Sequence, residues 1–107
     1  MTELEVTPQQ MAAQLKVTPP PRLLDIREPW EFKVVRLEGA QLATQELVDE
    51  VLSTWERDAP IICYCHHGVR SLQATLFLRQ QGFTKVYSLR GGINAYAMEV
   101  DPQLPRY

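Results

Sequence analysis

Apolar and polar positions alternate along the chain in two periods, which predicts strands that alternate with helices. Short apolar runs that predict strands lie at 4–6, 22–26, 39–42, 60–64 and 85–89. Helical spacing or helix-start signals lie at about 8–16, 28–32, 44–55, 71–81 and 93–98. This order is typical of an α/β domain, so we predict a mainly parallel sheet with helices on its faces.

Two of these helices have explicit start signals. Thr7-Pro8 places a capping hydroxyl before a proline at the first helical position. The helix that opens at Thr44 has its apolar residues at helical spacing, namely Leu47, Val48, Val51, Leu52 and Trp55.

Length and composition narrow the class of protein. The 107 residues, 45% hydrophobic and 22% charged, suit one globular domain over residues 1–107. A formal net charge of −2 without a basic stripe argues against nucleic acid as a partner. No stretch approaches the ~20 apolar residues of a membrane span, and residues 1–10 lack the pattern of a secretory signal. We therefore expect no membrane contact.

The two cysteines of the chain, Cys63 and Cys65, are two positions apart, at and just after the end of a predicted strand. At that spacing their side chains run roughly parallel, so we expect no disulfide between them. The chain does not resemble a disulfide-stapled secreted module, and we predict a cytoplasmic location. Cys63 is interpreted as a small core residue, with a role as a second, resolving thiol left open.

The segment CYCHHGVRS at 63–71 joins a predicted strand to a predicted helix. In an open parallel sheet, ligands bind at the edge formed by the carboxyl ends of the strands, where this segment lies. Gly68 can adopt a positive φ, and the amides from His66 to Arg70, including Val69, can converge as an anion-binding nest. These donors should surround the sulfur of Cys65 and stabilise it as a thiolate nucleophile.

The other polar side chains of this segment have weaker interpretations. Cys63, Cys65, His66 and His67 lack the distant second ligand pair of a structural zinc site, so we predict no metal site. The residues indicate no cofactor. Both histidines are expected to line the mouth of the loop and face solvent, and a proton-transfer role for His66 is left open.

At this point the sequence resembles the rhodanese family of sulfurtransferases. Three blocks contribute to the resemblance: LLDIREPWEF at 23–32, CHHGVRS at 65–71 and VYSLRGGINAYAMEVDPQLPRY at 86–107. The resemblance implies a rhodanese-like fold, a mostly parallel central sheet flanked by helices on both faces. It also implies that Cys65 forms a persulfide and that the amides of 66–70 hold its sulfur.

The resemblance further places Asp25 and Arg27 beside the pocket, either as a structural ion pair or helix cap, or as substrate contacts. Arg70 would bind an anionic donor or pair with an acid such as Asp25. Trp30 and Phe32 are expected in the core or the pocket wall. Two departures stand out: VRLEGA at 35–40 replaces a common family segment, and Tyr96 replaces a common tryptophan.

The predicted function is transfer of a sulfane sulfur through a Cys65 persulfide. The donor would be thiosulfate or a persulfide, and the acceptor cyanide, a thiol or a sulfur-accepting protein. The tail resembles modules fused to enzymes that activate sulfur-carrier proteins, which suggests a sulfur-relay partner by analogy.

Two other function classes remain. One is a binding module that keeps the fold without catalysis. The other is a cysteine-dependent phosphatase or arsenate reductase. Four residues separate Cys65 from Arg70 and six separate Cys63 from Arg70, so neither cysteine has the spacing of a phosphatase loop.

Overall fold

A five-stranded parallel sheet organises the computed structural model, which describes residues 4–107. The strands are β1 (Glu5–Val6), β2 (Arg22–Asp25), β3 (Gln41–Leu42), β4 (Ile61–Tyr64) and β5 (Val86–Leu89). The helices are α1 (Pro8–Gln14), α2 (Pro29–Val34), α3 (Gln45–Thr54), α4 (Val69–Gln80) and α5 (Gly92–Glu99). The strand order is β1-β5-β4-β2-β3, and each neighbouring pair is parallel. The predicted α/β class is confirmed.

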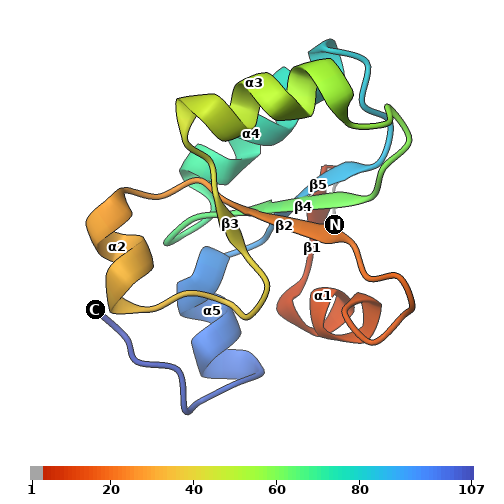
Figure 1. Ribbon diagram of the computed structural model, residues 1–107. Coiled ribbons are helices and arrows are strands. Elements are labelled where there is room, and N and C mark those ends of the chain that lie inside the picture. The colour runs from red at the N-terminus through yellow and green to blue at the C-terminus, as the bar shows by residue number, and fades with distance from the viewer. Residues whose placement is uncertain (1–3) are drawn as a thin grey trace.

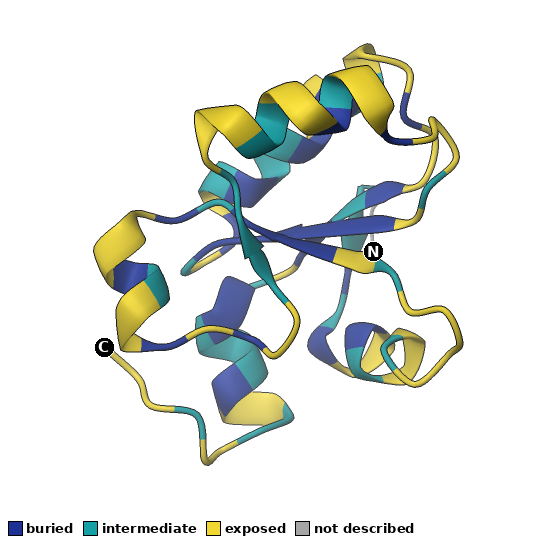
Figure 2. Ribbon diagram, in the orientation of Figure 1, coloured by how far each residue is buried: buried dark blue, intermediate teal, exposed yellow. Residues whose placement is uncertain are grey.

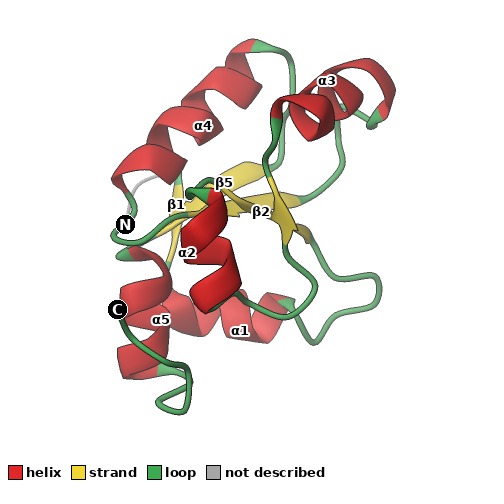
Figure 3. Cartoon of the chain, turned by 60° about the vertical axis from the view of Figure 1, so that its left-hand side comes forward, coloured by secondary structure: helices red, strands yellow, loops and turns green. Residues whose placement is uncertain are grey.

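Helices cover both faces of the sheet, as Figures 1 and 3 show. Helices α3 and α4 lie on one face, and α1 and α5 lie together on the other. Helix α2 lies beyond the carboxyl end of β2. Because the strands are parallel, the segments that follow β2, β4 and β5 all emerge at this same edge of the sheet.

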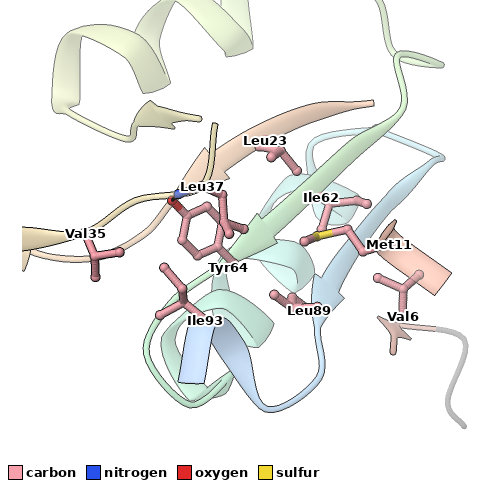
Figure 4. Close-up of a cluster of buried hydrophobic side chains, with 9 residues drawn as sticks. All are labelled: Val6, Met11, Leu23, Val35, Leu37, Ile62, Tyr64, Leu89 and Ile93. Carbon is pink, nitrogen blue, oxygen red and sulfur yellow. Dashed lines mark hydrogen bonds between the residues drawn. The ribbon is translucent and has the colours of Figure 1, made fainter. Parts of the chain in front are cut away.

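The alternation of side chains along the strands divides the core into two clusters. From β4, Ile62 and Tyr64 point toward α1 and α5, whereas Ile61 and Cys63 point toward α3 and α4. Figure 4 shows the first cluster, and Figure 2 shows that the buried backbone follows the central strands. Full burial of an aliphatic side chain of this size stabilises the fold by roughly 1.5–3 kcal/mol.

The predicted start signals of two helices are confirmed. The Thr7 hydroxyl accepts a hydrogen bond from the amide of Gln10 at 3.1 Å, and Pro8 begins α1. The Thr44 hydroxyl accepts one from the amide of Leu47 at 3.1 Å. These caps satisfy amide groups that a helix start leaves unpaired.

Some predicted boundaries are wrong by one or two residues. Strand β1 begins at Glu5 rather than at residue 4, and α1 ends at Gln14 rather than at residue 16. The largest consequence is at α4, which begins at Val69 instead of residue 71. Gly68 has a left-handed φ of 98° and is the N-cap, so the helix starts as soon as the loop has turned.

Candidate active site

The sulfur of Cys65 lies at the carboxyl end of β4, inside the first turn of α4. It accepts hydrogen bonds from the amide of Gly68 at 3.1 Å and from the amide of Ser71 at 3.3 Å. The sequence predicted donors between residues 66 and 70, and the second donor lies one residue beyond that range. Because α4 begins at Val69, its first turn brings the Ser71 amide onto the sulfur.

Two buried hydroxyls extend this environment. The Cys65 thiol donates to Ser71 Oγ at 3.4 Å, and Ser71 Oγ lies 2.8 Å from Ser88 Oγ. Both serines are fully buried. Sequence reasoning missed both as site residues. Ser71 was present in the quoted segment, but Ser88 comes from β5 and had no local signal.

The start of α5 contacts the backbone of the loop that begins at Cys65. The amide of Ile93 donates to the Cys65 carbonyl at 2.8 Å, and the amide of Asn94 donates to the His66 carbonyl at 3.1 Å. A Cβ atom on Gly92, which has φ of 66°, would collide with both carbonyl oxygens. The Gly91-Gly92 pair therefore lets the helix end approach the loop backbone closely.

Arg70 pairs with Glu31 of α2. Its guanidinium contacts the two carboxylate oxygens at 2.9 and 3.3 Å, with the Arg70 side chain 42% exposed and that of Glu31 only 5% exposed. The Arg70 guanidinium lowers the pKa of Glu31 to about 2. Sequence reasoning offered Asp25 as the acid partner of Arg70 and missed Glu31.

Asp25 cannot serve Arg70, because Arg27 already occupies it. The Arg27 guanidinium contacts both Asp25 carboxylate oxygens, at 2.8 and 2.7 Å, and neither side chain is exposed. The Tyr64 hydroxyl donates to Asp25 at 2.8 Å. These contacts describe a buried ion pair, one of the two interpretations that the sequence left open.

The ring of Tyr107 lies against the loop of residues 66–70. Sequence reasoning missed this contact. The Tyr107 ring stacks on His66 with ring centroids 4.3 Å apart, and it meets Trp30 edge-on at 5.8 Å. Its hydroxyl accepts from Arg27 at 2.8 Å and donates to Glu31 at 2.7 Å. Trp30 is 58% exposed, so it does not lie in the core, because α2 turns that side chain outward. Its contact with Tyr107 is compatible with the other predicted place, the pocket wall.

The two histidines differ in exposure, although both were expected to face solvent. His66 is half-buried and His67 is exposed, and their rings stack at 4.1 Å. Burial is the largest cause that lowers the pKa of His66, so its neutral form is favoured. Val69 is exposed beside them.

Cys63 lacks the backbone amide donors that face Cys65, and its polar neighbour is the buried hydroxyl of Thr75. It is fully buried in the cluster under α3 and α4, and both cysteines are free thiols. Burial raises the pKa of Cys63 to about 12, so this side chain stays a thiol at neutral pH.

Residues 4–107 contain neither a metal-binding cluster nor a membrane-spanning helix. No cluster of three or more histidine, cysteine, aspartate or glutamate side chains in this range is arranged to hold a metal ion. Within the same range, every helix is too short or too polar to cross a bilayer.

Comparisons with known proteins identify the family to which the chain belongs. The family described as Rhodanese-like domain matches residues 7–99. The chain is 36% identical over 95 residues to the thiosulfate sulfurtransferase GlpE of Glaesserella parasuis, and the match covers 89% of this chain and 87% of that protein. It is 33% identical over 104 residues to a Mycobacterium tuberculosis protein named "Probable adenylyltransferase/sulfurtransferase MoeZ".

The lengths of these relatives differ. The match to MoeZ covers 95% of this chain but 26% of that protein, so the chain spans about a quarter of it. Among solved structures, the human single-domain sulfurtransferase TSTD1 has a TM-score of 0.78 at 19% identity, covering 92% of this chain and 98% of that one. This last likeness concerns the fold alone. The family match and the sequence identities together show that the chain belongs to the rhodanese-like domain family.

Proposed function

We propose that this protein is a sulfurtransferase that moves a sulfane sulfur through a persulfide on Cys65. The Cys65 thiolate attacks the outer sulfur of thiosulfate, a new S–S bond forms, and sulfite leaves with the electron pair of the old S–S bond. A cyanide, thiol or protein acceptor then attacks the outer sulfur of the persulfide, and the Cys65 thiolate is restored.

The observation that carries this proposal is the pair of amides aimed at the Cys65 sulfur. Gly68 and Ser71 donate to it from the start of α4, where the helix dipole also favours negative charge. Such donors stabilise a thiolate before attack and again when sulfur transfer restores it. The loop amides of 66–70 are proposed to hold the terminal sulfur of the persulfide.

Family membership and the identity to sulfurtransferases support sulfur transfer in general. Thiosulfate as donor is proposed from the name of the GlpE relative. A sulfur-relay protein as acceptor is proposed from the MoeZ relative, whose name joins adenylyltransferase and sulfurtransferase. We also propose that residues 1–107 act as one domain, and that it works in the reducing cytoplasm, where Cys65 stays free.

Asp25 and Arg27 are proposed to position the site rather than to bind the donor. Their side chains are buried against each other, and the Tyr107 hydroxyl connects Arg27 to Glu31. Arg70 is partly exposed, so its guanidinium remains within reach of an anionic donor while it is paired with Glu31.

The decisive experiment is intact-protein mass spectrometry after incubation with thiosulfate and removal of excess donor. We expect wild type and Cys63→Ala to gain one sulfur that cyanide removes, and Cys65→Ala to gain none. Cys63→Ala is the matched control, because it removes a thiol two positions away that faces apolar side chains. If no form gains sulfur from thiosulfate or from an organic persulfide, the proposed function is wrong.

A further inference from the structure

Access to the Cys65 sulfur requires part of the protein to move. The residue is only 1% exposed, so a donor cannot reach the sulfur in the arrangement described above. On the side of the loop that faces α5, the amides of Ile93 and Asn94 donate to its carbonyl groups, and Gly92 lies against its backbone. These contacts hold that side of the loop against α5, so the side chains that contact the loop elsewhere are the candidates for movement.

The tail segment, residues 104–107, runs from the α5 side of the loop to the ring of His66. Leu104 packs against the core cluster under α1 and α5, and its amide donates to the Asp101 carbonyl at 3.1 Å. The chain then runs from α5 to the neighbourhood of α2, as Figure 1 shows. A small cleft separates it from the loop and from α5, lined by His66, Ile93, Asn94, Pro105, Arg106 and Tyr107.

Tyr107 is the residue of this segment that closes onto the site. Its ring covers His66, the residue next to Cys65, while its hydroxyl bridges Arg27 and Glu31. It is nevertheless 36% exposed, and the contacts that hold it are made by its own side chain. Anchored behind at Leu104, the ring can swing out without disturbing the sheet.

Displacement of this ring has a definite electrostatic consequence. When Tyr107 leaves, a buried Glu31 oxygen loses a 2.7 Å donor and Arg27 loses an acceptor at 2.8 Å. Loss of hydrogen bonds to charged groups is unfavourable. A small reagent that passes the ring with little displacement therefore reacts more readily than a bulky one.

We propose that Tyr107 is a specificity-determining residue that limits the size of the donors and acceptors able to reach Cys65. The proposal rests on the proposed function only for the identity of Cys65 as the reacting atom. It assigns the tail segment to substrate selection, with the aromatic ring as the barrier and the hydroxyl as its latch.

The first test measures barrier size without any turnover. Cys65 is alkylated with iodoacetamide and, separately, with fluorescein maleimide, and intact mass gives each rate. For Tyr107→Ala we expect the alkylation rate with the maleimide to rise about tenfold more than the rate with iodoacetamide. A factor of about ten corresponds to the free energy of one hydrogen bond to a charged group, which the bulky reagent has to break in wild type. Tyr107→Phe, which keeps the ring but loses the latch, should give a smaller change in the same direction.

Gln103→Ala is the matched control in the same stretch of chain. The Gln103 side chain is exposed and takes no part in the contacts of Tyr107 with His66, Arg27 and Glu31. This substitution should leave both rates unchanged. Equal acceleration of both reagents in Tyr107→Ala would mean general loosening of the loop and would overturn the proposal. Unchanged rates would overturn it as well. If Tyr107→Ala does not fold, the ratio of the two rates in Tyr107→Phe decides in the same way.

A second measurement separates this inference from the proposed function. We expect the ratio of kcat/KM for glutathione persulfide to that for thiosulfate to rise in Tyr107→Ala, whereas a purely structural role would lower both values in parallel. If wild type accepts sulfur from neither donor, the proposed function fails while the alkylation result still decides the role of Tyr107. If wild type accepts sulfur and the ratio does not change, the inference about Tyr107 fails alone.

Discussion

Cys63 and Cys65 are two residues apart, yet they lie in opposite environments. Cys63 is on the strand, where it lies among apolar side chains of the cluster under α3 and α4 and beside the buried Thr75 hydroxyl. Cys65 is one step past the strand end, where amides of Gly68 and Ser71 point at its sulfur. Both side chains are equally hidden from water, so the two sites differ in their hydrogen-bond donors rather than in their exposure. The comparison teaches that backbone donors, and not access to water, distinguish the proposed nucleophile from the buried thiol.

Removal of each thiol in turn is the strongest test of this comparison. Cys65→Ala should lower sulfur transfer from thiosulfate to cyanide by about a thousandfold or more, because the nucleophile is lost. Cys63→Ala should stay within about threefold of wild type, since a pKa raised to about 12 keeps that thiol un-ionised. Initial rates of thiocyanate formation measure both. A large loss in Cys63→Ala at unchanged stability would contradict the inert role of Cys63.

Crowding the support of the Cys65 loop should have the next largest effect. Gly92→Ala would push a Cβ atom into the carbonyl groups of Cys65 and His66. We expect a loss of about 2–4 kcal/mol in unfolding free energy and about a hundredfold in turnover, because the loop shifts.

Gly39→Ala is the control for backbone strain alone. Gly39 has φ of 82°, but an added Cβ would meet nothing within 4 Å. We expect it to cost about 1 kcal/mol and to leave turnover unchanged. Urea unfolding and initial rates check both variants, and equal effects of the two would mean that the close contact at Gly92 is unimportant.

The hydroxyl beside the Cys65 sulfur should have a moderate effect. Ser71→Ala keeps the amide that donates to the sulfur but removes the hydroxyl that lies between Cys65 and Ser88. In the thiolate form the sulfur has no proton to donate, so the Ser71 hydroxyl would donate to it instead. We expect persulfide formation in Ser71→Ala to slow by about tenfold, the effect of losing this one hydrogen bond to a charged group. Single-turnover rates with thiosulfate measure this. Ser53→Ala, an exposed serine on α3, should have no effect on the rate.

The ion pair outside the loop should have the smallest effect, and it should depend on pH. Because Arg70 holds the pKa of Glu31 near 2, below its ordinary value of 4.5, the pair stabilises the fold above pH 4.5. That contribution is lost as the pH falls from 4.5 toward 2. We expect Glu31→Gln to lower the unfolding free energy at pH 7 by about 1–2 kcal/mol, with solvent screening of Arg70 taken into account.

Denaturant unfolding at pH 7 and at pH 3 measures the difference between wild type and Glu31→Gln. The difference should shrink at pH 3. Gln80→Ala, at an exposed position of α4, serves as a control whose effect should not change with pH. A difference that is equal at both values of pH would contradict the assigned role of the Arg70–Glu31 pair.

Local signals predicted the parts of the site that neighbouring residues build. The strand before Cys65, the positive φ of Gly68 and the cap at Thr44 each depend on a few adjacent positions. The start of α4 was placed two residues late, because hydrophobic spacing cannot show where a loop finishes its turn. That error explains why the Ser71 amide was missed as a donor to the sulfur.

Long-range partners could not be predicted in this way. Arg70 pairs with Glu31, 39 residues away. It does not pair with Asp25, because the Arg27 guanidinium already forms a buried ion pair with that carboxylate. Tyr107 bridges Arg27 and Glu31 across 80 and 76 residues. Each acid and each base in the chain had several candidate partners, and no periodicity distinguishes among them.

The sequence by itself determined the alternation of strands and helices, the nucleophile candidate Cys65 and the turn at Gly68, because these follow from residue type and near neighbours. Only the tertiary structure decided what surrounds them. Ser88, Gly92 and Tyr107 reach the loop because parallel strands end at one edge of the sheet and bring distant segments together there. Packing of the two core clusters brings these segments together. Local patterns of residues in the sequence contain no information on the distances between segments far apart in the chain.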